Sequence, residues 1–206
     1  MPPLTSAAAV ATAWFALRAV LWITACVLLA DLITGMVHWA EDHYGDPAWP
    51  ILGQLVFAPN LEHHEKPRAF LAGGWWGANW PQIILAVAVA GGTAAVGWLT
   101  WQLALVLTLL ANANTVHQWA HMTVKETPRL VGWMQRMRLI QDRIHHGGHH
   151  GGRRDTAYCA LTPWVNPVVD RIGLWRAIEA VIKCTTGVKP RVDACVARRE
   201  QAARAR

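Results

Sequence analysis

The sequence predicts an all-α membrane protein with about three transmembrane helices and further amphipathic helices at the membrane surface. Three observations predict this class. Apolar residues make up 53% of the 206 residues and charged residues only 16%, whereas about a quarter of a soluble domain is charged. Thirteen Trp accompany two Tyr and three Phe, and Trp favours the membrane–water interface. Residues 69–124 contain no Asp, Glu, Lys or Arg, which is long enough for two membrane-spanning helices.

The first apolar segment runs from about Ala7 to Trp39 and is expected to form one long helix, with broken helices as the alternative. Arg18 and Asp31 interrupt it, and residues 19–30 alone are too short to cross the hydrocarbon core. Arg18 can extend its charged end to the interface. The segment lacks the basic start and cleavage site of a signal peptide, so we expect it to stay as an anchor.

The uncharged stretch is expected to hold one helix from Pro81 to Val96 and a second from Trp98 to His121, since Pro suits a first helical turn. The sequence Gly-Trp-Leu-Thr-Trp at 97–101 is the expected interfacial turn.

Two later segments, 129–144 and 164–183, are amphipathic and are expected to lie along the membrane surface. Residues 1–189 would then form a single membrane-embedded domain, and residues 190–206 a polar, mobile tail.

Three crossings place every histidine on one side of the membrane. Sixteen of the nineteen Lys and Arg follow residue 124, and the positive-inside rule makes that side cytoplasmic. Basic residues beside a hydrophobic domain favour anionic lipid headgroups as partners over nucleic acid. The four cysteines show no CxxC spacing, so we expect them to be reduced.

The strongest local signal is His-His-Gly-Gly-His-His at 145–150. On a helix, His145 and His149 share a face, as do His146 and His150, so two pairs could serve two metal ions. The alternative is a solvated histidine run. The Gly-Gly insert lowers helix propensity, so the ligands could leave a turn instead of a regular helix.

Further pairs have the same spacing: His117 with His121, and His38 with Asp42. Their alternatives are helix capping or a surface contact, and Asp42 could instead hold an imidazole in position. His63 and His64 are adjacent and would point about 100° apart on a helix, toward different metals or different roles. His43 does not fit this spacing and is not a ligand candidate.

Nine such histidines exceed what one zinc ion needs. Nitrogen-rich ligation with open positions suits iron that activates dioxygen. Soluble di-iron bundles use Glu ligands, but few carboxylates occur here. The sequence therefore predicts a histidine-rich centre of two iron ions of a membrane-bound kind.

Several motifs together resemble the lipid desaturase family that includes the plasmanylethanolamine desaturases. They are Asp-Leu-Ile-Thr-Gly-Met-Val-His-Trp-Ala-Glu-Asp (31–42), Glu-His-His-Glu-Lys-Pro (62–67), Asn-Thr-Val-His-Gln-Trp-Ala-His (114–121), and the 145–150 run followed by Tyr-Cys (158–159). Similar stretches continue at 164–166, 170–179 and 186–191, so the resemblance covers roughly residues 28–192.

The resemblance implies a membrane di-iron oxidoreductase that removes two hydrogens from a lipid chain, using dioxygen and electrons from a cytochrome b5-like or ferredoxin-like carrier. One branch of the family forms the vinyl-ether bond of plasmalogens, and a plant branch desaturates an acyl chain. The ligand candidates that it implies are His38, His63, His64, His117, His121, His145, His146, His149 and His150, with Asp42 at an acidic position of the first motif.

This chain departs from the family pattern at Lys66, at 71–75, at 43–45 and at Arg153. These positions lie near the expected substrate entrance and bear on the choice of lipid more than on the metal set. Candidates for holding a phosphate headgroup are Arg138, Arg143, Arg153 and Arg154, with Asn79 and Asn114; ordinary positive-inside charge is the alternative for the arginines.

The favoured function is desaturation of a lipid chain. A lipid or carotenoid hydroxylase on the same metal chemistry is the nearest rival. A metal transporter or other non-enzymatic metal-binding membrane protein is more distant, because transporters place ligands near the bilayer midplane. A zinc protease is weaker still, since no His-Glu-x-x-His occurs. The sequence leaves the oligomeric state open.

Overall fold

The computed structural model describes residues 4–151 and 155–191, and within these ranges the chain is helix and loop with no β-strand. The all-α prediction is therefore confirmed. The elements in order are α1 (Leu4–Tyr44), η1 (Gly53–Phe57, a π-helix), α2 (Ala58–Glu65), η2 (Ala69–Leu71), α3 (Gly74–Ala95), α4 (Trp101–Ala111), α5 (Ala113–His121), α6 (Arg129–Arg136), α7 (Arg143–His150), α8 (Asn166–Arg171) and α9 (Leu174–Thr186).

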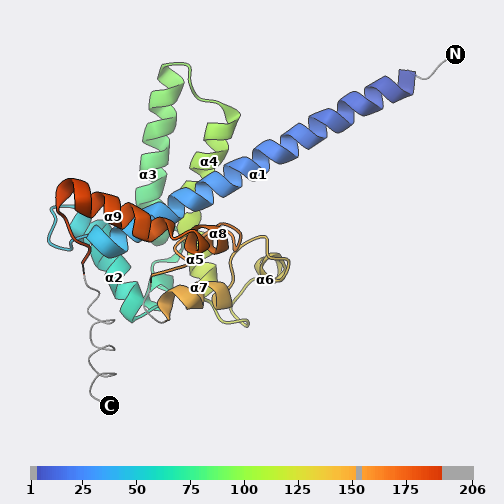
Figure 1. The fold of residues 1–206 in the computed structure, drawn as a ribbon. Helices are drawn as coiled ribbons and strands as arrows, with labels where there is room; N and C mark the ends of the chain where they lie inside the picture. The colour runs from blue at the N-terminus through green and yellow to red at the C-terminus, as the bar shows by residue number, and fades with distance from the viewer. Residues whose placement is uncertain (1–3, 152–154, 192–206) are drawn as a thin grey trace.

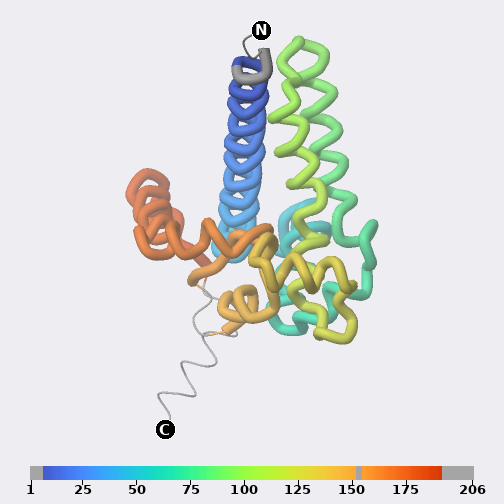
Figure 2. Tube along the Cα trace, turned by 90° about the vertical axis from the view of Figure 1, so that its right-hand side faces the viewer, coloured from blue at the N-terminus to red at the C-terminus, as the bar shows by residue number. Residues whose placement is uncertain are grey.

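The helices form two parts. α3 and α4 form a hairpin that extends from the rest of the molecule (Figure 2), and α1 leaves the same region at an angle to it, so that its N-terminal end lies away from the tip of the hairpin (Figure 1). The other helices, α2 and α5 to α9, gather at the opposite end (Figure 1). α1 and α3 each pack against α4. We call α1, α3 and α4 the arm of the molecule and the remaining helices its base.

α1 is continuous, as the sequence predicted. The span Ala7–Tyr44 is the one helix in the described part of the chain that is long and apolar enough, on its own, to qualify as a membrane span. At about 1.5 Å per residue, α1 exceeds the thickness of the hydrocarbon core. Only part of it can therefore lie in lipid.

The expected second helix begins earlier than predicted. α3 starts at Gly74, so Pro81 lies inside it and not in its first turn. Pro81 removes the hydrogen bond that would reach the carbonyl of Gly77. Both residues line the cavity described below, so the imperfect turn of α3 faces that space.

The expected helix from Trp98 to His121 is two helices, α4 and α5, which meet at Asn112. The Asn112 amide donates to the carbonyl of Thr108 and accepts from the indole N–H of Trp75 at 3.1 Å. A side chain that binds the neighbouring backbone competes with helix continuation. The predicted turn at 97–101 is confirmed, with Gly97 at φ +72°.

Each of the two predicted amphipathic segments contains parts of two helices instead of one. Segment 129–144 contains α6 and the start of α7, and segment 164–183 contains α8 and most of α9. Gly173 separates α8 from α9 at φ +68°, a conformation that glycine adopts readily. Of the expected tail, Pro190 and Arg191 are described: the Arg191 N–H donates to the carbonyl of His43 at 2.6 Å. Residues 192–206 lie outside the described part.

Candidate metal centre

Two groups of side chains in the base of the molecule could each hold a metal ion. Within each group, one ligand atom from every residue lies within 4.8 Å of the others. We call these groups site A and site B. Site A consists of His63, His117, His121, His146 and His150, and site B of His38, Asp42, His64 and His149.

Four helices supply these residues. α1 ends just beyond His38 and Asp42, which are one turn apart on the same face. α2 supplies the adjacent pair, and its two imidazoles enter different sites as adjacent residues on a helix should. α5 supplies both members of its pair to site A. α7 supplies the remaining three, and it stays helical through the Gly-Gly insert.

Backbone carbonyls orient three of the imidazoles. The Nδ1–H groups of His38, His63 and His149 lie 3.1, 2.6 and 2.9 Å from the carbonyl oxygens of Tyr158, Asn60 and Thr156. An Nδ1–H that donates to a carbonyl leaves Nε2 with a lone pair, which is the arrangement common in metal sites. The Nε2 atoms of these three histidines, and that of His117, are buried without a hydrogen-bond partner. Such atoms are costly unless a cation binds them, so the donor set fits metal ions.

The imidazoles of site A are held in the neutral form that binds metal. The Nε2 atom of His146 lies 3.0 Å from Nε2 of His121 and 2.9 Å from Nε2 of His150. Burial is the main reason that the pKa of His121 falls to about 4 and that of His150 to about 2. Burial also lowers the pKa of His146 well below its usual value. Metal binding therefore displaces no proton from these groups at neutral pH.

Asp42 gives site B a carboxylate that site A lacks. Its Oδ1 accepts a hydrogen bond from the Asn60 amide at 2.7 Å and lies 3.0 Å from Nε2 of His64. Its Oδ2 lies 3.4 Å from Nε2 of His149 and 3.7 Å from Nε2 of His38. The carboxylate thus points among the three imidazoles of its site.

His145 is the one predicted ligand that the structure places in neither site. Its Nε2 accepts a hydrogen bond from the Asn166 amide at 2.9 Å, and its backbone N–H donates to the Asp142 carboxylate that caps α7. The expectation that the i,i+4 pairs of this run divide between two metals is corrected accordingly. His146 and His150 share site A, while His149 alone enters site B.

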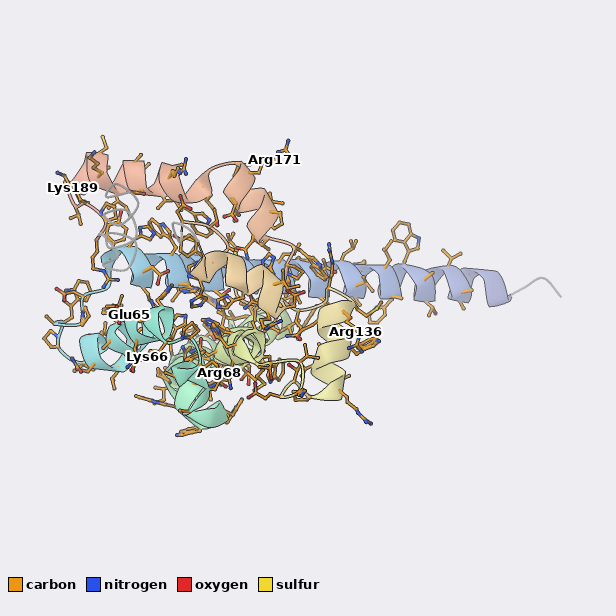
Figure 3. The ribbon with its side chains drawn as sticks, turned by 90° about the horizontal axis from the view of Figure 1, so that it is seen from below. Glu65, Lys66, Arg68, Arg136, Arg171 and Lys189 are labelled. Atoms are coloured by element: carbon orange, nitrogen blue, oxygen red, sulfur yellow. The ribbon has the colours of Figure 1, made fainter. Side chains whose placement is uncertain are left out.

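The predicted headgroup residues are scattered. Arg143 is exposed, and Arg153 and Arg154 lie outside the described residues. Asn79 is fully buried and donates to the carbonyl of Trp75 and the hydroxyl of Thr115. Asn114 lines the cavity while its amide donates to the carbonyl of Ala78. Arg68 and Arg136, both labelled in Figure 3, are exposed side chains of the base.

An apolar cavity of about 500 Å³ opens beside the metal sites. His38, His63 and His117 line one end. The other end lies among the long helices, where its wall is formed by Leu85, Ala86 and Val89 of α3 and Leu107 of α4. Ile33 and Val37 of α1 also line the cavity. The cavity thus connects the apolar arm to both metal sites.

Sequence reasoning missed several residues that shape this region. Asn60 holds Asp42, and the carbonyl of Tyr158 orients His38. Glu41 and Gln82 are polar groups in the cavity wall. Asn60 and Glu41 lie within a few residues of a ligand in the sequence, and this closeness could have identified them. The role of Tyr158 depends on a contact 120 positions away, which spacing does not reveal.

The sequence of this chain is similar to those of known desaturases. The model of the lipid desaturase domain matches residues 27–193. Plasmanylethanolamine desaturase 1 of Mus musculus is 32% identical over 186 residues, which cover 84% of this chain and 68% of that protein. Plasmanylethanolamine desaturase of Myxococcus xanthus is 31% identical, covering 87% and 65%. Fatty acid desaturase 4-like 2, chloroplastic, of Arabidopsis thaliana is 31% identical, covering 80% and 60%.

The chain thus spans roughly two thirds of the length of these relatives. No solved structure matches it. The family model covers most of the chain, including every residue of sites A and B. The chain belongs to the lipid desaturase family.

Proposed function

We propose that this protein is a membrane-bound di-iron enzyme that uses dioxygen to introduce a double bond into a lipid chain. The observation that carries the proposal is the cavity, whose apolar walls lead from the long helices to His38, His63 and His117. A pocket lined mainly by apolar side chains, with few polar groups at one end, suits a ligand with a long hydrocarbon chain.

Sites A and B would hold the two iron ions through eight imidazoles and the Asp42 carboxylate. When bound, iron supplies the activation of dioxygen that side chains cannot provide, because saturated C–H bonds are strong. The protein itself orients the ligands and keeps water away from the substrate. The carbonyls of Tyr158, Asn60 and Thr156 fix ring orientations, and the apolar walls exclude water from the reacting carbons.

The arm of the molecule is proposed to cross the membrane three times, through α1, α3 and α4, and α5 continues the third crossing into the base. Large apolar side chains are exposed along it: Phe15 of α1 is 76% exposed, and Trp98 at the tip of the hairpin is 74% exposed. Contiguous exposed apolar surface of this kind indicates contact with lipid. The base, with the metal sites and most of the positive charge, would face the cytoplasm.

The direction of the cavity favours a reaction near the polar end of the lipid. With the headgroup at the base, the first carbons of the chain would lie beside sites A and B, and the tail would extend between α1 and α3. Formation of a vinyl-ether bond beside an ether oxygen fits this placement, and two of the relatives are named plasmanylethanolamine desaturases. Desaturation of an acyl chain close to its ester is the second candidate, supported by the relative named a fatty acid desaturase.

The test is a mass-spectrometric lipidome of a host that expresses the protein and is fed an alkyl-ether lipid. His146→Ala, which removes a ligand of site A, is the negative control, and His145→Ala is the matched control on the same helix. We expect a lipid two hydrogens lighter with the wild type and with His145→Ala, and none with His146→Ala.

The position and nature of the change separate the candidates. Release of an aldehyde by acid identifies a vinyl ether, whereas a change in ordinary acyl lipids identifies acyl desaturation. A gain of one oxygen would contradict desaturation and establish a hydroxylase. Purified protein that binds no iron would contradict the whole proposal.

A further inference from the structure

Five ring-bearing side chains pack together beside site B, and none of them lines the cavity. We call them the aromatic cluster: Trp39, His43, Tyr44, Tyr158 and Trp175. Tyr158 is 1% exposed, and Trp39 and Trp175 are each 4% exposed. The cavity and the aromatic cluster thus approach the metal centre along separate routes.

Tyr158 is the member that contacts the metal ligands most closely. Its ring centroid lies 5.0 Å from that of His149 and 5.9 Å from that of His38, both in site B. Its backbone carbonyl also accepts the Nδ1–H of His38 at 3.1 Å. Side chain and backbone of the same residue therefore connect the aromatic cluster to site B.

Two routes lead from Trp39 to Tyr158. One passes through His43, with ring centroids 5.6 and 5.9 Å apart and a 2.8 Å hydrogen bond between His43 Nε2 and the Tyr158 hydroxyl. The other passes through Trp175, with centroid distances of 6.2 and 5.1 Å. Both routes converge on Tyr158.

The aromatic cluster extends to α9, which carries Trp175. Tyr44, at the end of α1, has its ring 5.4 Å from that of Trp39. Ile178 and Ile182 of α9 pack against the buried core that contains Trp39, Tyr158 and Trp175. The positive side chain of Lys189 lies beside the C-terminal end of α9 (Figure 3). A chain of rings in contact therefore extends from site B to this helix.

The proposed reaction needs electrons from outside. Dioxygen takes up four electrons on becoming two water molecules; the two C–H bonds that break supply two, and a carrier must supply the other two with two protons. We propose that the aromatic cluster conducts these electrons from a one-electron carrier protein on the α9 side to site B. In each transfer the carrier is oxidised and the metal centre reduced by one electron, and no bond of the cluster is broken.

This inference rests on the proposed function, because it assumes redox-active iron at sites A and B. Conjugated rings in van der Waals contact couple an electron donor to an acceptor better than saturated side chains do. Since both routes pass through Tyr158, that residue should control the rate, whereas Trp175 serves one route only.

The exposed thiol of Cys184 on α9 allows a direct measurement. A ruthenium photosensitiser is attached there in an iron-loaded, full-length protein in which Cys195 is replaced by Ser. A laser flash then injects one electron, and loss of the ferric absorption gives the transfer rate without turnover. We expect Tyr158→Leu to slow transfer by about tenfold or more, and Tyr158→Phe, which keeps the ring, to restore most of the rate.

Controls keep the result interpretable. Trp133→Leu removes an exposed indole on α6, outside the aromatic cluster, and should leave the rate unchanged. If Tyr158→Leu loses iron, the paired substitution His43→Leu with Trp175→Leu cuts both routes and leaves Tyr158 in place; it should slow transfer in the same way. Equal rates in these iron-loaded variants would overturn the inference alone, whereas a wild type without iron would overturn the proposed function.

Discussion

The carboxylate of Asp31 accepts a hydrogen bond from the hydroxyl of Thr162, with 2.5 Å between the two oxygens and 131 positions between the residues. The same carboxylate accepts the backbone N–H groups of Leu161 and Thr162 at 2.8 and 3.1 Å. All of these groups are buried. α1 is thereby joined to the segment that carries Tyr158, whose carbonyl orients His38 in site B.

Replacing Asp31 by Leu should destabilise the protein by about 3 kcal/mol, because three buried donors lose their acceptor. Iron content should also fall, since the carbonyl of Tyr158 would lose its fixed position. Unfolding in detergent micelles, followed by circular dichroism, measures the first effect. Thr12→Val, which removes an exposed hydroxyl from the same helix, should change neither quantity; an Asp31→Leu protein as stable as the wild type would contradict the expectation.

The two metal sites should empty independently. His146→Ala removes a ligand of site A and His149→Ala a ligand of site B, whereas His145 belongs to neither. Iron per chain, measured by mass spectrometry of the purified protein, should be two in the wild type and in His145→Ala. Each of the other variants should lose one iron, and loss of iron in His145→Ala would show that the assignment of this histidine is wrong.

The cavity should be blocked by a side chain added at Gly77. A Cβ atom at this position would meet no atom within 4 Å, and the residue lines the cavity near the metal sites. Gly77→Leu should therefore fold and bind iron normally while losing most of its lipid desaturation. Gly91→Leu on the same helix also adds a side chain in open space, but outside the cavity wall, and should remain active. Equal activity of the two variants would contradict the assigned substrate path.

The metal-free protein should lose stability in mildly acidic solution. Burial lowers the pKa of His121 from 6.5 to about 4 in the folded state. Between these two values the unfolded chain binds more protons than the folded chain, so stability falls as pH falls from about 6.5 to 4. Melting temperatures of chelator-treated protein at pH 7.5, 6 and 5 test this, and the iron-loaded protein is the comparison. An unchanged melting temperature of the metal-free protein across this range would contradict the claim that the folded state keeps these buried imidazoles neutral.

The sequence predicts the helices well and their boundaries poorly. The apolar lengths and the absence of charge between 69 and 124 suffice for the long helices, because helices satisfy their own backbone groups. The division at Asn112 depends on its contact with Trp75, and the early start of α3 at Gly74 overrides the preference of Pro81 for a first turn. Both are tertiary effects that local preference does not contain.

In the metal centre too, the sequence predicts the features that local spacing determines and misses those that distant contacts determine. Helical spacing correctly groups His117 with His121 and His38 with Asp42, since each pair lies on one face of one helix. The separation of His145 from its neighbours depends on Asn166, and the orientation of three imidazoles depends on carbonyls of other residues. Two of these contacts, those of Asn166 and Tyr158, bridge more than twenty positions, and no spacing rule describes them.

The order of the ligands along the chain has a consequence for biosynthesis. Site A takes ligands from residue 63 to residue 150, and site B from residue 38 to residue 149. The carbonyl that orients His38 belongs to Tyr158. Contacts between such distant residues form late in folding. When only the first two thirds of the chain have been synthesised, the whole arm has been made but neither site is complete, because His146, His149 and His150 are still missing. The proposed iron ions can therefore be fully bound only after α7 has been synthesised.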